Sequence, residues 1–192
     1  LVGSEMCIRD RSQDAPSSGV GKVEVSVDGG PWLAASGLFP WIYAWMVPGN
    51  GPHNLRSRAT DRAGNVETPG AGINVIVDNA LPASFIMTPY NGQIINATGY
   101  VITGTASDVH SGVKRVEVST AGGASWGYTT MVNATTWIYT WAVPGDGIYN
   151  LRTRAVDNAN NVEIPSTGIS VQVDRTPPCL LYTSDAADEE DS

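Results

Sequence analysis

The amino-acid sequence predicts an all-β protein made of two tandem β-sandwich domains, the first of which lacks its first two strands. Three observations predict this fold class: a long internal repeat, short segments in which apolar and polar residues alternate, and turn residues between those segments. Helical spacing of apolar residues is absent. Because strict alternation buries one face of a strand and leaves the other in water, we expect antiparallel sheets that pack face to face.

Three blocks of the first copy return in the second copy. The blocks and their counterparts are 18–26 and 111–119, 41–49 and 137–145, and 55–61 and 151–157. The offset is 93 residues for the first block and 96 for the other two, which places an insertion near residues 130–134. A repeat of this length is the size of one seven-stranded sandwich domain.

Strands are predicted where the alternation lies between turn sequences such as Pro144-Gly145-Asp146-Gly147. In the second copy they are placed at 84–88, 98–107, 113–120, 126–131, 136–143, 148–157 and 168–174. The first copy begins at about Gln13, so it has no equivalent of the first two of these strands. Its remaining strands are therefore expected to present unpaired edges.

The alternating apolar faces also predict the core. Its predicted members are Val23, Val25, Trp45, Leu55, Ala59, Val75, Val77, Ile102, Val116, Val118, Trp141, Leu151, Ala155, Val171 and Val173.

The two ends of the chain are assigned to neither domain. Residues 6–11 and 179–184 can be encoded by one DNA word and its reverse complement, as happens when one adapter is joined to both ends of a DNA fragment. We interpret the ends as translated sequencing adapter and expect the chain to be a fragment. The predicted segments are 1–11 and 179–192 for the adapter, 12–79 for the truncated domain, 80–83 for the linker and 84–178 for the second domain.

Charge and cysteine content exclude several classes of function. Residues 12–178 carry 9 basic and 12 acidic side chains, a net charge of −3 in place of −8 for the whole chain. Mild acidity argues against nucleic acid or an anionic membrane surface as a partner. Both cysteines, Cys7 and Cys179, lie in the ends, so no disulfide is expected. No apolar run is long enough to predict membrane insertion.

The most specific motif runs from Gly147 to Pro165 and reads GIYNLRTRAVDNANNVEIP, followed by VQVDRTPP at 171–178. These motifs resemble the tandem bacterial immunoglobulin-like (Ig-like) repeats of large surface and secreted proteins, and the resemblance covers residues 13–178. It implies a two-sheet sandwich, an extracellular or cell-surface location, and neighbouring Ig-like repeats as partners. The first copy departs from the pattern at His53, where the second copy has Tyr149.

No catalytic residue is predicted, and the chain is not expected to be an enzyme. His53 and His110 lie at non-equivalent positions, and neither has a serine, cysteine or second histidine nearby in sequence to form a nucleophile–base pair. Glu24 and Glu117 fall on the polar faces of strands. Cross-strand ion pairs with arginines of the neighbouring strand explain them better than acid–base catalysis.

Each copy carries an aromatic triplet on one side of a strand. The triplets are Trp41, Tyr43 and Trp45 in the first copy and Trp137, Tyr139 and Trp141 in the second. If that side faced water it would form a platform for sugar rings, and if it faced inward it would fill the core. Burial is the usual state of large aromatic residues in a small domain, so the core interpretation is favoured.

A group of oxygen-bearing side chains is the candidate metal site. Its members are Asp78, Asn79, Asp108, Asp157, Asn161 and Glu163. Calcium prefers carboxylate and amide oxygens as ligands, so these residues could bind it. The alternative interpretation is that Asp157 and Asn161 are turn formers, whose side chains bond to their own backbone. Because an Ig-like sandwich is entered at one pole and left at the other, Asp78 is expected beside the loops that hold Asp108 and Asp157. No cofactor other than calcium at this site is expected.

The predicted function is that of a non-catalytic Ig-like repeat, a spacer or adhesive arm of a larger secreted or cell-surface bacterial protein. The alternative is an accessory module, with carbohydrate as its ligand, attached to a secreted hydrolase. A surface protein or a glycan is the kind of external partner that these two functions imply.

Overall fold

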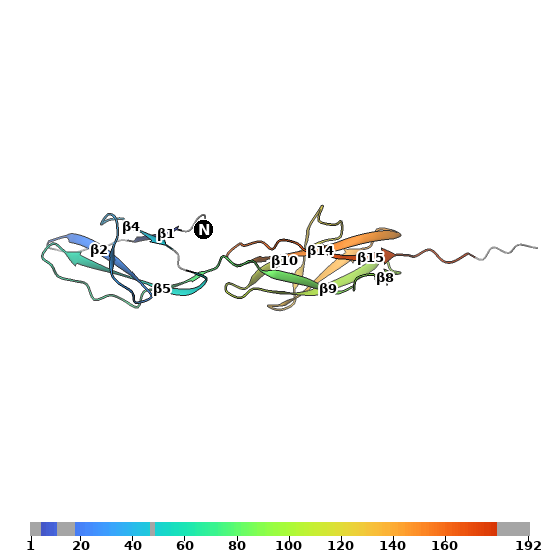
Figure 1. Cartoon of the computed structure of the whole chain (residues 1–192), viewed down its shortest axis with the longest axis horizontal. Coiled ribbons are helices and arrows are strands. Elements are labelled where there is room, and N and C mark those ends of the chain that lie inside the picture. Colours follow the sequence, from blue (N-terminus) through green and yellow to red (C-terminus); the bar gives the residue numbers. More distant parts are fainter. Residues whose placement is uncertain (1–4, 11–17, 47–48, 180–192) are drawn as a thin grey trace, which may run out of the picture. The chain divides into compact units, whose positions relative to one another are not determined.

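A computed structural model of the chain describes residues 5–10, 18–46 and 49–179. Over these residues it contains 15 β-strands and no helix, so the predicted all-β class is confirmed (Figure 1). The described residues form two compact units. One holds the chain up to Ser84 with 106–116 and 154–164, and the other holds 85–105, 117–153 and the chain from Pro165.

A search of the described residues for a helix long and apolar enough to cross a membrane finds none.

The second copy is a sandwich of two sheets with strand orders β11-β10-β14-β15-β8 and β12-β13-β9-β7. Its strands are β7 (Ala83–Thr88), β8 (Ile94–Ile95), β9 (Gly99–Ser107), β10 (Val113–Ser119), β11 (Gly127–Tyr128), β12 (Thr130–Met131), β13 (Thr136–Ala142), β14 (Gly147–Asp157) and β15 (Ile169–Val173). Every strand predicted in this copy is present. The segment predicted at 126–131 forms two short strands, β11 and β12, that belong to different sheets.

Strand β8 is the one element of the second copy that the sequence did not predict. It pairs in parallel with β15 through Ile94 and Ile95 alone. Two residues are too few to show an alternating pattern, so nothing in the sequence distinguishes them from a loop.

The first copy contains the sheet β3-β2-β5-β6 and the pair β1-β4. Its strands are β1 (Glu5–Asp10), β2 (Val20–Val27), β3 (Leu33–Ala34), β4 (Trp41–Met46), β5 (Gly51–Asp61) and β6 (Ile73–Val77). Glu24 of β2 lies opposite Arg58 of β5, and its Oε2 is 2.9 Å from the arginine Nε. The cross-strand ion pair expected for Glu24 is therefore confirmed.

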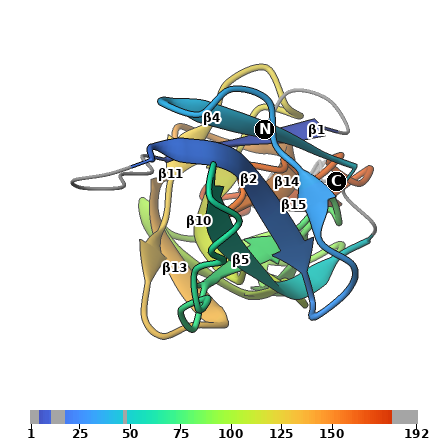
Figure 2. The same cartoon turned by 90° about the vertical axis from the view of Figure 1, so that its left-hand side faces the viewer.

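The pairing of β4 differs from the pairing that the sequence predicts. Residues 1–11 were expected outside the fold and β4 was expected to have a bare edge, yet β1 pairs with β4 from Glu5 opposite Met46 to Asp10 opposite Trp41 (Figure 2). A bare edge offers N–H and C=O groups to any extended segment, whatever its side chains. That these residues are translated adapter stays a prediction, as do the domain boundaries.

The predicted core is confirmed for all but two of its members. Only Ala59 and Val75 are half-buried, and both belong to the first copy. Trp41 and Trp45 are 3% and 4% exposed, and Trp137 and Trp141 are 0% and 3% exposed. The aromatic triplets therefore face inward, and their tryptophans form no exposed platform for sugar rings.

One glycine of the second copy is required by packing. A Cβ added to Gly104 in β9 would overlap the Phe85 carbonyl oxygen and the indole ring of Trp137, which is fully buried. Gly99, in the same strand, has no atom closer than 3.9 Å to the place where its Cβ would be.

We expect Gly104→Ala to destabilise the second copy by about 3 kcal/mol because the tryptophan or the β7 backbone must move. Gly99→Ala is the matched control and should change the free energy of unfolding by less than about 0.5 kcal/mol. Urea denaturation of the full chain measures both. Equal effects of the two substitutions would contradict the packing argument.

His53 stands in the first copy where the second copy has Tyr149. In the second copy the Tyr149 hydroxyl donates to the Gly145 carbonyl at 2.9 Å. In the first copy Nε2 of His53 lies 3.1 Å from the Gly49 carbonyl, and Nδ1 lies 2.7 Å from Oδ2 of Asp28. Both neighbours are acceptors, so both ring nitrogens are satisfied only in the protonated imidazolium. The hydrogen bond to Asp28, with that to Gly49, raises the pKa of His53.

A group whose pKa is raised by folding stabilises the fold below its unfolded pKa and loses that contribution as pH rises through the folded value. The first copy should therefore lose stability over neutral and mildly alkaline pH, above the ordinary histidine pKa of about 6.5. His53→Tyr should remove this dependence, because tyrosine donates to Gly49 without titrating in that range. If the melting temperature depended on pH equally in the wild type and in His53→Tyr, His53 would not be a protonated imidazolium in the fold.

The two copies should also differ in stability when separated. We expect residues 84–178 alone to melt at a higher temperature than residues 13–83 alone, since only the former has both sheets over its core. A cooperative, high-melting transition of 13–83, measured by circular dichroism, would contradict this.

Candidate metal centre

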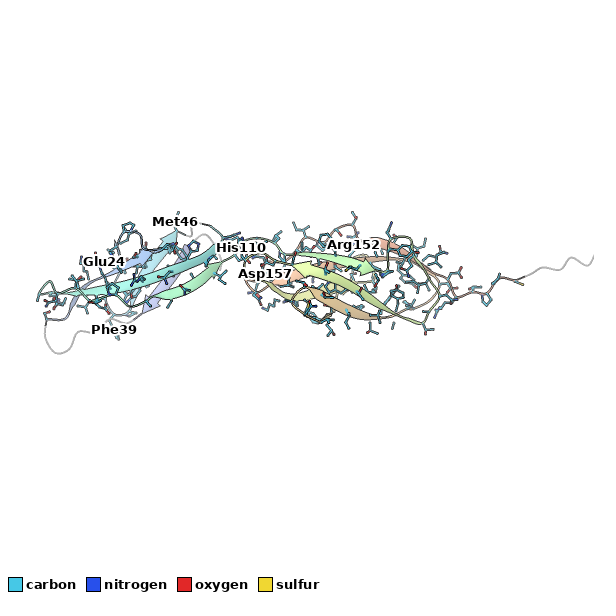
Figure 3. All side chains as sticks on the ribbon, turned by 90° about the horizontal axis from the view of Figure 1, so that it is seen from below. Glu24, Phe39, Met46, His110, Arg152 and Asp157 are labelled. Carbon is cyan, nitrogen blue, oxygen red and sulfur yellow. The ribbon has the colours of Figure 1, made fainter. Side chains whose placement is uncertain are left out.

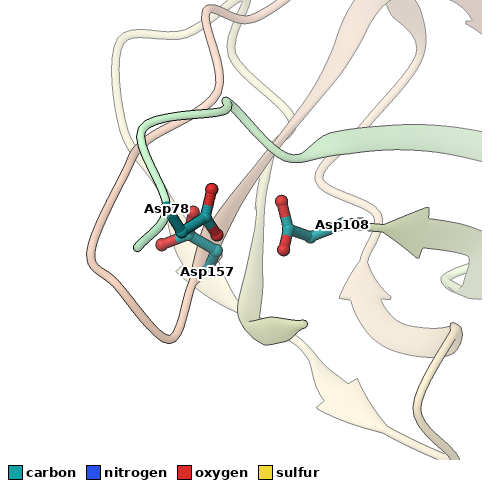
Figure 4. A group of neighbouring side chains, drawn as sticks. All are labelled: Asp78, Asp108 and Asp157. Carbon is teal, nitrogen blue, oxygen red and sulfur yellow. The ribbon is translucent and has the colours of Figure 1, made fainter. Parts of the chain in front are cut away.

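Three aspartates converge in the first compact unit. Asp78 follows β6, Asp108 follows β9 and Asp157 ends β14 (Figure 4). One carboxylate oxygen from each lies within 4.8 Å of the others. Two oxygen ligands on opposite sides of a calcium ion are about 5 Å apart. The spacing therefore suits a single hard cation.

The cluster is mostly enclosed. Asp157 is fully buried and Asp78 is 2% exposed, while Asp108 is half-buried. Figure 4 shows the Asp108 carboxylate directed toward the other two. Like charges this close repel, and burial weakens the screening that water would provide.

Asp108 supplies a second sign of an incomplete site. Its Oδ1 accepts N–H groups from His110, Ser111 and Gly112 at 2.8–3.2 Å. Its Oδ2 is buried and has no hydrogen-bond partner in the described part of the chain. A buried carboxylate oxygen without a donor is costly, and a metal ion is one of the groups that can satisfy it.

Asp78 is held by neutral donors from the predicted linker and from the second copy. Its Oδ1 accepts the N–H of Ala80 at 2.9 Å and its Oδ2 accepts the N–H of Ser111 at 3.1 Å. Burial raises the pKa of Asp78, but the hydrogen bonds from Ser111 and Ala80 outweigh it and hold the pKa below its usual value. The carboxylate is therefore ionised at neutral pH.

Asp157 and Asn161 form a turn, which is the alternative to a metal site. Oδ1 of Asp157 accepts the N–H of Asn161 and Oδ2 accepts its Nδ2–H, both at 2.7 Å. The same Nδ2 also donates to the Asp78 carbonyl oxygen at 3.0 Å. Asp61 and Asn65 make the same turn in the first copy. The turn thus holds the Asp157 carboxylate where it joins the three-aspartate cluster. The turn-forming and metal-binding interpretations are therefore compatible.

Asn79 and Glu163 lie outside the cluster. The N–H of Asn79 donates to Oδ1 of Asn50 at 3.0 Å. Glu163 accepts the N–H and hydroxyl of Ser84 and, at 2.8 Å, the N–H of Ala155, so it connects β7 to β14. No sequence pattern indicates this role, because Ser84 is 79 residues from Glu163.

Comparisons with known proteins bear on the fold. No family model and no curated protein matches the chain. The chain is similar to the fibronectin(III)-like modules of CbhA from Clostridium thermocellum, at 20% identity over 89% of this chain and 85% of that one, with a TM-score of 0.51.

Two further solved structures resemble the chain more weakly. Dimeric latent PorU from Porphyromonas gingivalis has 16% identity over 83% of this chain and 20% of its own, with a TM-score of 0.42. The glucan-locus protein SGBP-B from Bacteroides ovatus has 15% identity over 79% and 38%, with a TM-score of 0.29. The likeness to the CbhA modules shows a β-sandwich fold of the fibronectin and Ig-like kind.

Proposed function

We propose that the chain is a non-catalytic repeat module, a spacer or adhesive arm of a larger secreted or cell-surface bacterial protein. We further propose that a hard cation such as calcium, held by Asp78, Asp108 and Asp157, orders the connection between its two copies. The convergence of these carboxylates is the observation that carries the proposal.

The contacts around Asp78 support a role in ordering the connection. Asp78 is the first residue after the last strand of the first copy, and Ser111 and Asn161 of the second copy both donate to it. A cation bound by all three carboxylates would also link Asp78 to Asp108 and Asp157. It would also neutralise the repulsion among two buried charges and one half-buried charge. Residues 79–82 would then be held at both ends.

The accessory module with a carbohydrate ligand receives less support. The tryptophans that would stack on sugar rings are in the core. The spacer or adhesive arm needs no exposed aromatic surface, and it is consistent with the repeated sandwich and the junction of aspartates.

Calcium titration tests the proposal. We expect millimolar calcium, compared with chelator, to raise the melting temperature of the full chain, since a metal that binds only the folded state stabilises it by about 1.4 kcal/mol at ten times Kd. Asp108→Asn should abolish this rise while remaining at least as stable as wild type in chelator, because one of three like charges is gone.

Asp61→Asn is the matched control for this titration. It alters the same type of turn in the first copy, away from the cluster, and should leave the calcium effect intact. Superimposed wild-type curves with calcium and with chelator would refute the metal site, as would loss of the effect in Asp61→Asn but not in Asp108→Asn.

A further inference from the structure

The first copy has an unpaired sheet edge at a place where the second copy has a paired one. Within the described residues β6 is the last strand of its sheet, whereas β15 continues to β8. Strands β6 and β15 are equivalent because their registers agree: Gly51 lies opposite Val77 in the first copy, and Gly147 lies opposite Val173 in the second. The outer edge of β6 is therefore a place where another strand can add.

Backbone bonds in the second copy show which groups of this edge point outward. The N–H of Gln172 and the carbonyl of Ser170 bond to the backbone of residues 92–93, at 3.0 and 2.7 Å. In the repeat these two residues correspond to Ile76 and Asn74 of β6. Both are exposed, and the described part of the chain offers neither of them a paired strand on this side. Their N–H and C=O groups are therefore available to another strand.

A proline in β5 supports this assignment. Pro52 lies opposite Ile76 and has no N–H. Successive pairs of an antiparallel ladder alternate between pairs that exchange two hydrogen bonds and pairs that exchange none. Because proline cannot complete the first kind, the pair of Pro52 and Ile76 is of the second kind. The N–H and C=O of Ile76 therefore point away from β5.

The β6 edge lacks the features that usually protect sheet edges. Residues 73–77 read INVIV and contain no charged residue and no proline. Their pairing with β5 is regular, without a bulge. Ile73 and Ile76 are 55% and 57% exposed. Charged side chains, proline and bulges are the devices that keep strand edges from associating, so this edge can meet an identical one without repulsion.

The occupant that fits this edge is the same edge of a second molecule. We propose that the β6 strands of two molecules pair antiparallel about a twofold axis, with Val75 opposite Val75. In this register Ile76 of each molecule lies opposite Asn74 of the other, and the two residues exchange N–H···O=C bonds. Each molecule contributes its strand without giving up a pairing, because β6 keeps β5 on its other side.

The side chains agree with this register. Val77 is buried on the core face of β6, and Ile73 lies on the same face but is exposed. The twofold pairing places Ile73 opposite Val77 of the other molecule, which removes apolar surface from water. Strand β15 of the second copy cannot pair in this way because β8 occupies its edge. Since both molecules use the same patch, association ends at the dimer.

Sedimentation velocity of the full chain over a series of concentrations tests the proposal. Ile76→Pro removes the outward N–H and leaves the bonds between β5 and β6, and we expect it to raise the Kd of the dimer at least about tenfold. Ile76→Thr is the matched control. It also removes apolar bulk but keeps the N–H and a high β-propensity, so it should change the Kd less than about threefold.

A dimer formed through other exposed apolar side chains would respond differently. Phe39 and Met46 project from the first copy into solvent (Figure 3), and Met46 belongs to β4 of the other sheet. Contacts through these two residues need no backbone group of β6. Equal Kd values for Ile76→Pro and Ile76→Thr would indicate such a contact and overturn the proposal. A wild-type chain that stays monomeric at every concentration would overturn it as well.

Disulfide crosslinking tests the register without a proline, in a Cys7→Ser/Cys179→Ser background. Val75→Cys brings two thiols opposite each other, where the Cα atoms of a pair without hydrogen bonds are about 4.5 Å apart, a separation that a disulfide spans. Ile73→Cys is the matched control on the same face, and its two thiols would lie about 13 Å apart along the strands. We expect Val75→Cys to form the covalent dimer at least tenfold faster under mild oxidation. Equal rates, or no dimer from Val75→Cys, would refute the pairing.

Discussion

Pairing along the edge of one strand, β4 in the first copy and β13 in the second, is the constraint on which the rest of the structure depends. A strand edge presents N–H and C=O groups that another strand or water must satisfy. In the second copy β9 satisfies the edge, brings Ile102 and Gly104 into the core, and leads directly to Asp108. In the first copy β1 pairs with the same edge, while a cavity remains beside Trp41.

The candidate metal centre follows from the same framework. Its three aspartates stand at the ends of β6, β9 and β14, and neutral donors of the surrounding loops orient their carboxylates. Backbone N–H groups can hold a carboxylate in place without neutralising it. The fold thus keeps negative charge at one point, which is the property that the proposed cation site requires.

Most of the fold was predictable from the sequence, because period-two alternation reports which face of a strand is buried. The proximity of Asp78, Asp108 and Asp157 was also predictable, since the poles of a sandwich determine which loops meet. The pairing of β1 was not, because it depends on an unpaired backbone edge and leaves no pattern in the side chains. The links from Glu163 to Ser84 and from His53 to Asp28 join distant residues whose types alone do not identify partners.

Amide hydrogen exchange, followed by mass spectrometry, measures the pairing of the β4 edge most directly. The account predicts that weakening β1 with Cys7→Pro/Ile8→Pro accelerates exchange in residues 41–46 and leaves residues 136–142, which pair with β9, unchanged. Unchanged exchange in residues 41–46 would show that β1 does not protect this edge, and it would contradict the claim on which the description of the first copy rests.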